Sequence, residues 1–485
     1  MTAQQTQPQD IPMSEVGRLP TSQEVEDTNN SPTESPPAET TTSSSAPQAE
    51  RSKSAYLVLA GCVLIQAPIW GYSLAFGIFQ EYYTTHGAAV LPDGPGTPGT
   101  IASIGNAQTG ILYLMMPATF VLLTKYPYLR RWCAPLGLLV TTACLLASSF
   151  ATSAHQLIAT QGVLHAVGCG LLFSPTSLSL DEWFSERKGL AYGAMWASKS
   201  TVGAGMPFLT SALLNRFGVR TTLRAYAVSS ALLTIPPLFL IREYPAAASS
   251  SSSSSPSEEH GVQQQSGRQQ RQPGRVSFAF ARHSIFWILQ WGNILQSLGY
   301  LMPSTYLASY AHALGFPSIT GPIFLALISL ASVPGSLLIG LLNDTGLAPT
   351  TVILISSLGS AASVFLLWGL GGHQVAVLVV FTLMYGFFAG GFSSTWSGIL
   401  QEMKRRDGAM DTGLIFGMLL GGRGLGFVLS GPIGGALLEA NRLKAQDFTG
   451  YATQYGPMVI YTGLTATLGA WGWFWTMGKQ VMRAL

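Results

Sequence analysis

The sequence predicts an all-α integral membrane protein with twelve transmembrane helices arranged in two six-helix halves. Hydrophobic residues make up 48% of the 485 residues and charged residues only 10%, against about 25% in soluble domains. The polar residues concentrate in residues 1 to about 52 and about 244 to 275, which are rich in Ser, Gln, Pro and Glu, so the remaining chain is more apolar than this average. Two apolar stretches that begin at Gly189 and Gly413 resemble each other, which indicates a duplicated bundle.

The predicted spans are apolar runs, each close to the length that crosses a bilayer as a helix. The runs of the first half lie near 55–80, 101–124, 132–152, 155–180, 189–214 and 222–242. Those of the second half lie near 284–309, 317–342, 350–371, 374–400, 412–438 and 456–478. We therefore expect a disordered cytosolic tail at 1–52, an N-terminal half at 53–243, a cytosolic linker at 244–282 and a C-terminal half at 283–485.

The distribution of Lys and Arg predicts the orientation of the bundle. The loops expected on the inner side are basic: they hold Lys125, Arg130, Arg131, Arg187, Lys188, Lys404, Arg405 and Arg406. The outer loops near 81–100, 310–316 and 371–374 hold no Lys or Arg, although Arg216, Arg220 and Arg224 surround the outer turn after the fifth span. The bias predicts that both termini are cytosolic, in a multi-pass protein of the cell membrane.

Each of the two matching stretches has one cationic residue, and the two occupy equivalent positions. Lys199 lies about ten residues inside the fifth span, hence about 15 Å from its mouth, and Arg423 lies at the same depth in the eleventh. A cation inside a membrane is costly, so it usually faces a wet cavity or a partner. We predict that both bind substrate, the planar guanidinium being suited to a carboxylate. The alternatives are that Lys199 snorkels or binds a carbonyl, and that Arg423 binds carbonyls of a neighbouring helix.

Further candidates have weaker signals. His165 lies midway along the fourth span, where it could bind substrate or simply form a hydrogen bond within the packing. Trp196 and Tyr300 are candidate substrate contacts, together with other aromatic residues that could equally belong to interface belts: Trp70, Tyr72, Trp291, Tyr306, Tyr385 and Trp396. No Asp or Glu lies near the centre of a predicted span, which leaves Lys199 and His165 as the titratable candidates for proton coupling.

Two further patterns concern gating and packing. Asp181, Glu182, Arg187 and Lys188 lie between the fourth and fifth spans, where they form either a cytosolic gate of ion pairs or ordinary solvated loop charge. Glycines recur every four residues in the matching stretches, which predicts close helix contacts at Gly189, Gly193, Gly413, Gly417 and Gly421.

Other classes of protein find no support in the sequence. No span carries a metal-binding spacing or a nucleophile beside its base, so we expect no enzyme, no metal site and no cofactor. The basic residues form short clusters between apolar runs and no continuous face, which argues against a nucleic-acid partner. The expected partners are the lipid bilayer and a small, anionic substrate.

Several segments resemble a known family. They are Phe76–Tyr83 at the end of the first span, Phe173–Gly193 with Pro207 after it, Arg220–Arg224, and Gly431–Ile433. The chain resembles the monocarboxylate-porter branch of the major facilitator superfamily in its fungal form, over about 55–480. The resemblance implies the major facilitator fold and secondary active transport by alternating access. It implies a small, monocarboxylate-like organic anion as substrate, or, as the alternative, export of a fungal secondary metabolite.

The chain departs from the proton-coupled animal members of that branch. Ser73 stands where those members have a lysine in the first span, and the run from Pro317 to Leu342 lacks their Asp/Arg pair. The acidic motif that other facilitators have between spans two and three is replaced by Lys125–Arg131. A lactate-and-proton mechanism therefore does not carry over residue by residue.

Overall fold

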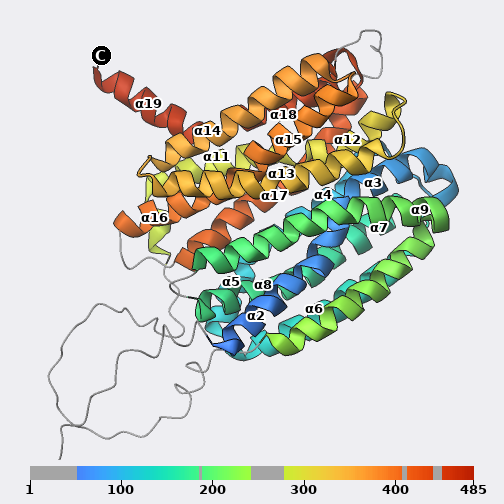
Figure 1. Cartoon of the computed structure of the whole chain (residues 1–485), viewed down its shortest axis with the longest axis horizontal. Helices are drawn as coiled ribbons and strands as arrows, with labels where there is room; N and C mark the ends of the chain where they lie inside the picture. The colour runs from blue at the N-terminus through green and yellow to red at the C-terminus, as the bar shows by residue number, and fades with distance from the viewer. Residues whose placement is uncertain (1–51, 185–187, 242–277, 407–411, 441–449, 485) are drawn as a thin grey trace, which may run out of the picture. The chain divides into compact units, whose positions relative to one another are not determined.

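The computed structural model describes residues 52–184, 188–241, 278–406, 412–440 and 450–484, which belong to one compact unit, Ala46–Leu485 (Figure 1). The described residues form α-helices joined by short turns, 3₁₀ segments and π segments. The expected tail, apart from Ser52, and the expected linker up to residue 277 lie outside the described residues.

The N-terminal half begins with helix α2 at Lys53, one residue after the predicted tail. Its helices are α2 (Lys53–Leu64), α3 (Gln66–Val90), α4 (Pro98–Leu114), α5 (Met116–Lys125), α6 (Arg130–Ser148), α7 (Ala154–Leu157), α8 (His165–Trp183) and α9 (Lys188–Leu240), with a π segment at Ile158–Leu164. Helix α9 contains two predicted spans, because the chain turns back at Gly218, whose φ of 72° favours glycine (Figure 1).

The C-terminal half begins with the 3₁₀ turn Ala279–Arg282. Its helices are α11 (Ser284–Tyr300), α12 (Met302–Ala313), α13 (Thr320–Asp344), α14 (Pro349–Ala362), α15 (Val375–Gly391), α16 (Trp396–Arg406), α17 (Thr412–Ala440), α18 (Gly456–Leu468) and α19 (Trp471–Ala484). A π segment, Ser363–Leu370, continues α14, and the 3₁₀ turn Phe392–Thr395, called η5, links α15 to α16.

Nine helical stretches within the described residues are long and apolar enough to cross a membrane. One of them, Gly193–Leu240, holds the fifth and sixth predicted spans on either side of Gly218. The seventh predicted span is divided between α11 and α12, and the twelfth between α18 and α19, and neither is among these nine stretches. The multi-pass all-α architecture is confirmed, whereas the count of twelve stays a prediction.

Several spans are interrupted partway through, and a proline follows closely after two of these interruptions. Helices α4 and α5 meet at Met115, and α11 and α12 meet at Leu301, with Pro117 and Pro303 near the start of the second helix in each pair. Proline lacks the N–H that would continue the helix. Broken helices at membrane depth occur where backbone lines a cavity.

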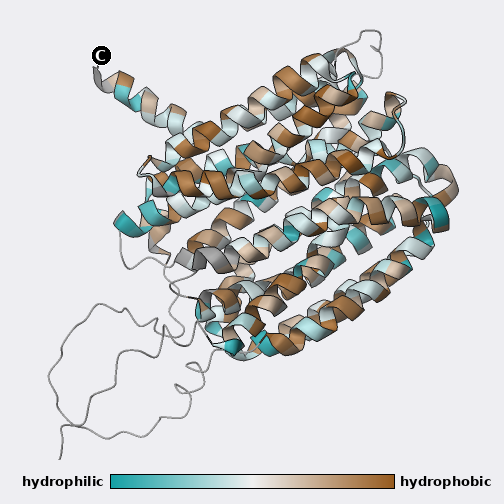
Figure 2. Ribbon diagram, in the orientation of Figure 1, coloured by the Kyte–Doolittle hydropathy of each residue, from teal (hydrophilic) through white to brown (hydrophobic). Residues whose placement is uncertain are grey.

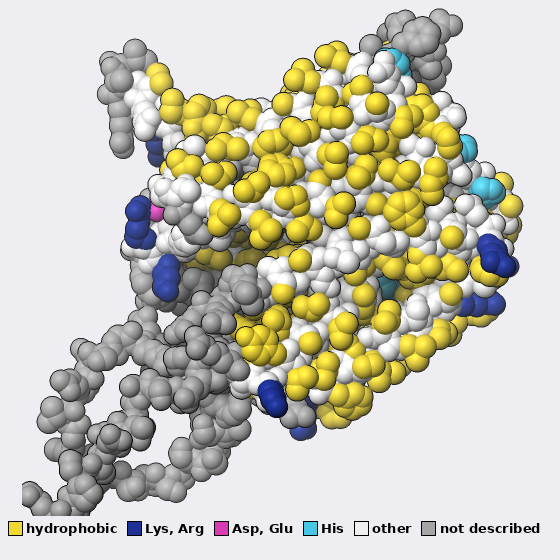
Figure 3. Space-filling view, viewed as in Figure 1, with side chains coloured by type: hydrophobic (Ala, Val, Ile, Leu, Met, Phe, Trp, Pro, Cys, Tyr) yellow, Lys and Arg dark blue, Asp and Glu magenta, His cyan; other side chains and the backbone are white. Residues whose placement is uncertain are grey.

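The outer surface of the bundle is apolar. Large hydrophobic side chains such as Leu139, Leu232 and Phe239 are 65%, 65% and 76% exposed. Figures 2 and 3 show the hydrophobic residues spread over the flank of the helices, while Lys and Arg gather near the two ends. Such a continuous apolar flank needs a lipid environment, because soluble monomers expose apolar patches of only a few hundred Å².

The bundle has two ends, which we name by the helix ends and turns that lie there (Figure 1). Lys125 ends α5 and Arg405 lies in the last turn of α16, and we call this the basic end. The other end, called the sealed end, has the turns that follow α3 and α12.

At the sealed end the two halves approach closely through glycines. A Cβ added to Gly99 of α4 would lie 2.4 Å from the Cα of Gly435 in α17, and one added to Gly77 of α3 would lie 2.3 Å from the carbonyl oxygen of Ser304 in α12. No side chain fits in these contacts, which therefore close this end of the space between the halves.

Candidate functional site

A cavity of about 890 Å³ lies between the two halves. Helices α3, α4, α5, α8 and α9 line it from the N-terminal half, and α11, α12, α13, α15, η5, α16 and α17 line it from the C-terminal half. The lining extends to Thr124, beside Lys125, and to Gln401 of α16, so the cavity reaches the basic end. In transport by alternating access, one of the two states is closed at one end and has its central cavity open to the other end. The sealed end and the cavity that reaches the basic end match such a state.

Lys199 lines the cavity from α9 and lies against two aromatic rings. Its Nζ is 4.1 Å from the centre of the Trp70 ring and 5.1 Å from that of Trp196. The indole N–H of Trp70 donates to Gln66 Oε1 at 2.9 Å, and Gln66 Nε2 donates to the carbonyl of Cys62 at 2.8 Å, which fixes the indole plane. The ammonium is thus held by ring faces and remains available to a negatively charged group.

Arg423 lines the same cavity from α17, and four aromatic rings surround it. Its Cζ lies 4.4 Å from the centre of the Tyr300 ring, 5.3 Å from Phe392 and Phe427, and 5.8 Å from Trp396. The side chain is 3% exposed, and Nη1 finds no hydrogen-bond partner among the described residues. A buried guanidinium with an unused donor is a good site for a carboxylate oxygen.

A chain of aromatic rings joins the surroundings of the two cations. Trp70, beside Lys199, lies 5.7 Å from Tyr113 of α4, and Tyr113 lies 5.5 Å from Phe427 of α17, edge to face. Phe427 stacks on Tyr300 with the ring centres 5.6 Å apart. The two cations of the sequence repeat therefore share one cavity, and an aromatic surface that crosses between the halves connects them.

Hydroxyl groups cover much of the remaining wall. They are contributed largely by serine: Ser73, Ser177, Ser200, Ser304, Ser329, Ser332, Ser336, Ser393, Ser394 and Ser397. Ser200 and Ser332 lie 3.0 Å apart across the two halves. Serines offer either a donor or an acceptor, so this wall can bind the polar groups of many substrates.

The charge in the cavity is entirely positive among the described lining residues. Lys199 and Arg423 are its two charged residues, and no Asp or Glu is among the described residues that line it. The aromatic walls and the absence of a carboxylate together favour an anion that has an apolar portion.

The predicted aromatic candidates divide between the cavity and other places. Trp196 and Tyr300 line the cavity, as do Trp70, Tyr385 and Trp396. The others lie elsewhere: Tyr72 is buried within the N-terminal half, Trp291 is 56% exposed, and Tyr306 lines a second, smaller cavity.

His165 is 1% exposed at the start of α8 and is not among the residues that line the cavity. Its ring lies edge-on to Tyr72, with centres 5.5 Å apart, and its nitrogens lie 3.7 and 3.8 Å from Cys169 Sγ. Tyr72 in turn donates to Gln161 Oε1 at 2.5 Å. A role of His165 in substrate binding stays a prediction, and its position outside the cavity lining does not support that role.

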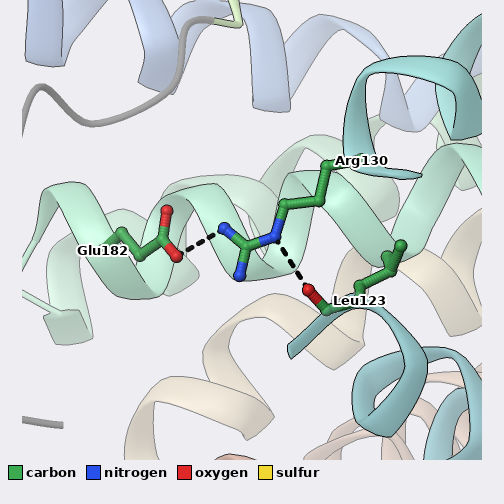
Figure 4. A network of polar contacts seen from close by, with 3 residues as sticks. All are labelled: Leu123, Arg130 and Glu182. Carbon is green, nitrogen blue, oxygen red and sulfur yellow. Dashed lines mark hydrogen bonds and ion pairs between the residues drawn. The ribbon is translucent and has the colours of Figure 1, made fainter. Parts of the chain in front are cut away.

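The predicted gating charges are described only in part. Arg187 lies outside the described residues, as do the side chains of Asp181 and Lys188. Glu182 accepts a hydrogen bond from Arg130 Nη1 at 2.5 Å, and Arg130 Nε donates to the carbonyl of Leu123 at 3.3 Å (Figure 4). This network joins α5, α6 and α8 within the N-terminal half.

The glycine prediction is confirmed at Gly417 and Gly421 of the eleventh span and wrong at Gly193 of the fifth, and it stays a prediction at Gly413 and at Gly189, whose surroundings lie outside the described residues. A Cβ added to Gly417 or Gly421 would lie 3.0 Å from Phe120 or 2.5 Å from Pro117. Gly193, in contrast, has no atom within 4 Å of an added Cβ and lines the cavity.

Four aromatic residues that line the cavity were missed from the sequence: Tyr113, Phe120, Phe416 and Phe427. Phe427 follows Arg423 by four residues on a helix, so the spacing placed both on one face and could have identified it.

Comparison with known proteins identifies the family. A family model described as Major Facilitator Superfamily matches residues 63–410. The chain is 27% identical to the MFS-type transporter pynF of Aspergillus niger over 407 residues, which cover 83% of this chain and 86% of that protein. It is 26% identical to the agnestins efflux protein AgnL12 of Paecilomyces divaricatus over 424 residues, 87% and 88% of the two chains.

A human protein is also similar: monocarboxylate transporter 10 is 24% identical over 411 residues, 83% of this chain and 76% of that protein. Among solved structures, the nucleoside transporter NupG has a TM-score of 0.58 at 14% identity, covering 84% of this chain and 97% of that one. The human organic anion transporter MFSD10 has a TM-score of 0.55 at 13% identity, covering 87% and 99%. At these identities the two structures show a shared fold.

Proposed function

This chain belongs to the Major Facilitator Superfamily and is an integral, multi-pass membrane transporter, and from that premise we propose that it carries an organic anion with an aromatic or otherwise flat apolar body. The anion binds in the cavity between the halves. Its negative group lies between Lys199 and Arg423, and its body lies on the aromatic surface of Trp70, Tyr113, Phe427 and Tyr300.

The observation that carries this proposal is the placement of Lys199 and Arg423 in one cavity whose described lining has no carboxylate. A cation without a counter-ion is costly inside a membrane, and a bound anion removes that cost. The free Nη1 of Arg423 supplies a hydrogen bond that the protein itself leaves unused.

The size of the cavity favours a larger substrate over a three-carbon monocarboxylate. Its volume of about 890 Å³ lies near the top of the range that holds drug-sized ligands, about 300–1,000 Å³. We therefore propose efflux of a metabolite-sized anion as the leading form of this function. The agnestins efflux protein, named for such a role, is similar over most of its length. Import of a small monocarboxylate is the second form, supported by the likeness to monocarboxylate transporter 10.

Alternating access completes the mechanism. The sealed end and the open cavity correspond to one state, and rocking of the two halves about the bound anion gives the other. The basic end faces the cytosol of a cell-membrane protein in this proposal, as the Lys and Arg bias predicts. Lys199 is the group in the cavity that could exchange a proton during the cycle, since His165 lies outside the lining.

The test is transport by purified protein in liposomes, with labelled aromatic carboxylates and labelled short-chain monocarboxylates compared at equal concentration. Lys199→Ala and Arg423→Ala are expected to insert normally and to lose most transport of the better substrate. Lys404→Ala, which removes an exposed cation at the basic end, is the matched control and keeps its transport. Wild-type rates in both cavity variants would exclude the two-cation site, and faster uptake of the short acids would favour the second form.

A further inference from the structure

A second cavity, of about 220 Å³, lies at the sealed end. Its walls come from both halves: α3 and the start of α4 contribute from the N-terminal half, and α12, α17 and the segment before α18 contribute from the C-terminal half. It is separate from the substrate cavity, since the two share no described lining residue.

Three residues that line this cavity have buried polar atoms without a hydrogen-bond partner among the described residues. Gln80 is 0% exposed and its Oε1 accepts no hydrogen bond from the residues that the structure describes, although its Nε2 donates to the carbonyl of Pro98 at 3.0 Å. Tyr306 is 1% exposed and its hydroxyl is unpaired among the described residues, as is the hydroxyl of Ser309. All three residues line the cavity. Buried polar atoms are normally satisfied, so these atoms indicate a polar ligand. The two hydroxyls can donate or accept, whereas Gln80 Oε1 can only accept and so favours a ligand with positive charge or hydrogen-bond donors.

The electrostatics favour a positive guest. Glu81 of α3 and Glu439 of α17 line the cavity, and neither Lys nor Arg is among the described lining residues. Helix α12 ends at Ala313, close to its lining residue His312, so it presents the negative end of its helix dipole there.

The other titratable groups around the cavity are few. His312 lies at the end of α12, and Tyr306 and Tyr455 line the wall. His86 lies five residues beyond Glu81 on α3 and stacks on Tyr82 with ring centres 4.6 Å apart, outside the lining.

We propose that this second cavity binds a small monovalent cation, held by Glu81, Gln80 Oε1 and the hydroxyls of Tyr306 and Ser309, and that the cation holds the two halves together at the sealed end. Opening of this end separates α3 from α12 and α17 and so dismantles the site. The bound cation therefore stabilises the state described here and slows its conversion to the other. The same chemistry suits an alkali-metal ion or a proton shared between these oxygens.

Binding is measured without any transported substrate, so the result is independent of the proposed function. The midpoint of thermal unfolding of the purified full chain is recorded in NaCl, KCl and choline chloride at equal ionic strength. A saturable rise in Na⁺ or K⁺ over choline is expected. Glu81→Gln should weaken the apparent affinity roughly tenfold, and Tyr306→Phe by a few fold, because each removes one oxygen ligand. Asp93→Asn, which neutralises an exposed carboxylate outside the lining, should leave it unchanged.

A second arm distinguishes the proton from an alkali-metal ion. In choline chloride alone, a proton bound in the folded state stabilises it at acidic pH, and the gain is lost as pH rises. This pH response should disappear in Glu81→Gln and persist in His312→Gln.

Two results would overturn the site. The first is a midpoint that is equal in all three salts and has no pH response dependent on Glu81. The second is an undiminished cation response in both Glu81→Gln and Tyr306→Phe. Because Tyr306→Phe changes a single hydroxyl, it keeps the test decisive even if Glu81→Gln fails to fold.

Discussion

The ammonium nitrogen of Lys199 lies 4.1 Å from the centre of the Trp70 ring. The two residues come from different helices, α9 and α3, so the contact sets the position of the cation relative to a wall of the cavity. Because the hydrogen bond to Gln66 fixes the indole, this position is built into the first span.

Trp70→Leu should raise the KM for the transported anion by roughly 2- to 30-fold, the equivalent of a cation–π contact worth about 0.5–2 kcal/mol. Trp70→Phe keeps a ring face and should cost less. The measurement is the concentration dependence of uptake into liposomes. Trp291→Leu changes a residue that is 56% exposed on the flank and serves as the matched control. Equal KM values for Trp70→Leu and wild type would show that Trp70 does not position Lys199 for binding.

Arg423→Lys should retain the charge and still weaken substrate binding about tenfold, because lysine lacks the planar fork that binds a carboxylate in two places. Direct binding to the purified protein, measured by calorimetry, checks this. Arg224→Lys is the control: Arg224 is also stacked on a ring, with its Cζ 4.9 Å from the centre of Phe150, but it lies outside the cavity lining. Unchanged affinity in Arg423→Lys would mean that charge alone is recognised.

Gly99→Leu should shift the protein away from the sealed state, because no Cβ fits beside Gly435. The readout is the reactivity of a cysteine introduced by Ser103→Cys toward a water-soluble maleimide, since Ser103 lies against Gly431 in the same contact. Reactivity should rise in the Gly99→Leu background. Gly205→Leu, at a position with no atom within 4 Å of an added Cβ, should leave it low. A maleimide reaction that stays slow in the Gly99→Leu background would mean that this contact does not hold the end closed.

Arg130→Glu should destabilise the N-terminal half, because it places a carboxylate beside Glu182, and the double swap Arg130→Glu with Glu182→Arg should restore most of the loss. The side chains are 18% and 28% exposed, so solvent screens the pair and its coupling is expected to be about 1 kcal/mol or less. A double-mutant cycle on thermal unfolding measures it. The pair Glu402–Arg405, within one helix and with the arginine 80% exposed, should couple more weakly. No recovery in the double swap would show that the ion pair does not brace these helices.

The sequence predicted the membrane architecture because composition and run length report directly on lipid exposure. It predicted Lys199 and Arg423 as candidate site residues because a cation inside a membrane span has a large energetic cost. Such a residue usually faces a wet cavity or a partner that reduces this cost. Tyr113 and Phe427 escaped notice because an aromatic residue in a membrane helix carries no comparable cost. Their importance arises from contacts between α4 and α17, which are far apart in the chain.

The breaks within the helices and the second cavity could not be predicted from the sequence, because both depend on contacts between helices. The breaks before Pro117 and Pro303 were not predicted, because whether a helix ends or merely kinks at proline depends on neighbours that satisfy the backbone. Glu81 looked like an ordinary charge at the end of the first span. Only packing against α12 and α17 encloses it beside Gln80 and Tyr306.

The positive charge of the cavity has an electrical consequence. An empty carrier that reorients moves Lys199 and Arg423 through part of the membrane field, whereas a carrier loaded with a monoanion moves one net charge fewer. Each elementary charge that crosses the full field contributes about 2.3 kcal/mol per 100 mV. Voltage therefore acts unequally on the loaded and the empty steps, and turnover with a monoanion that carries no proton along generates a current whose sign reports the direction of net transport.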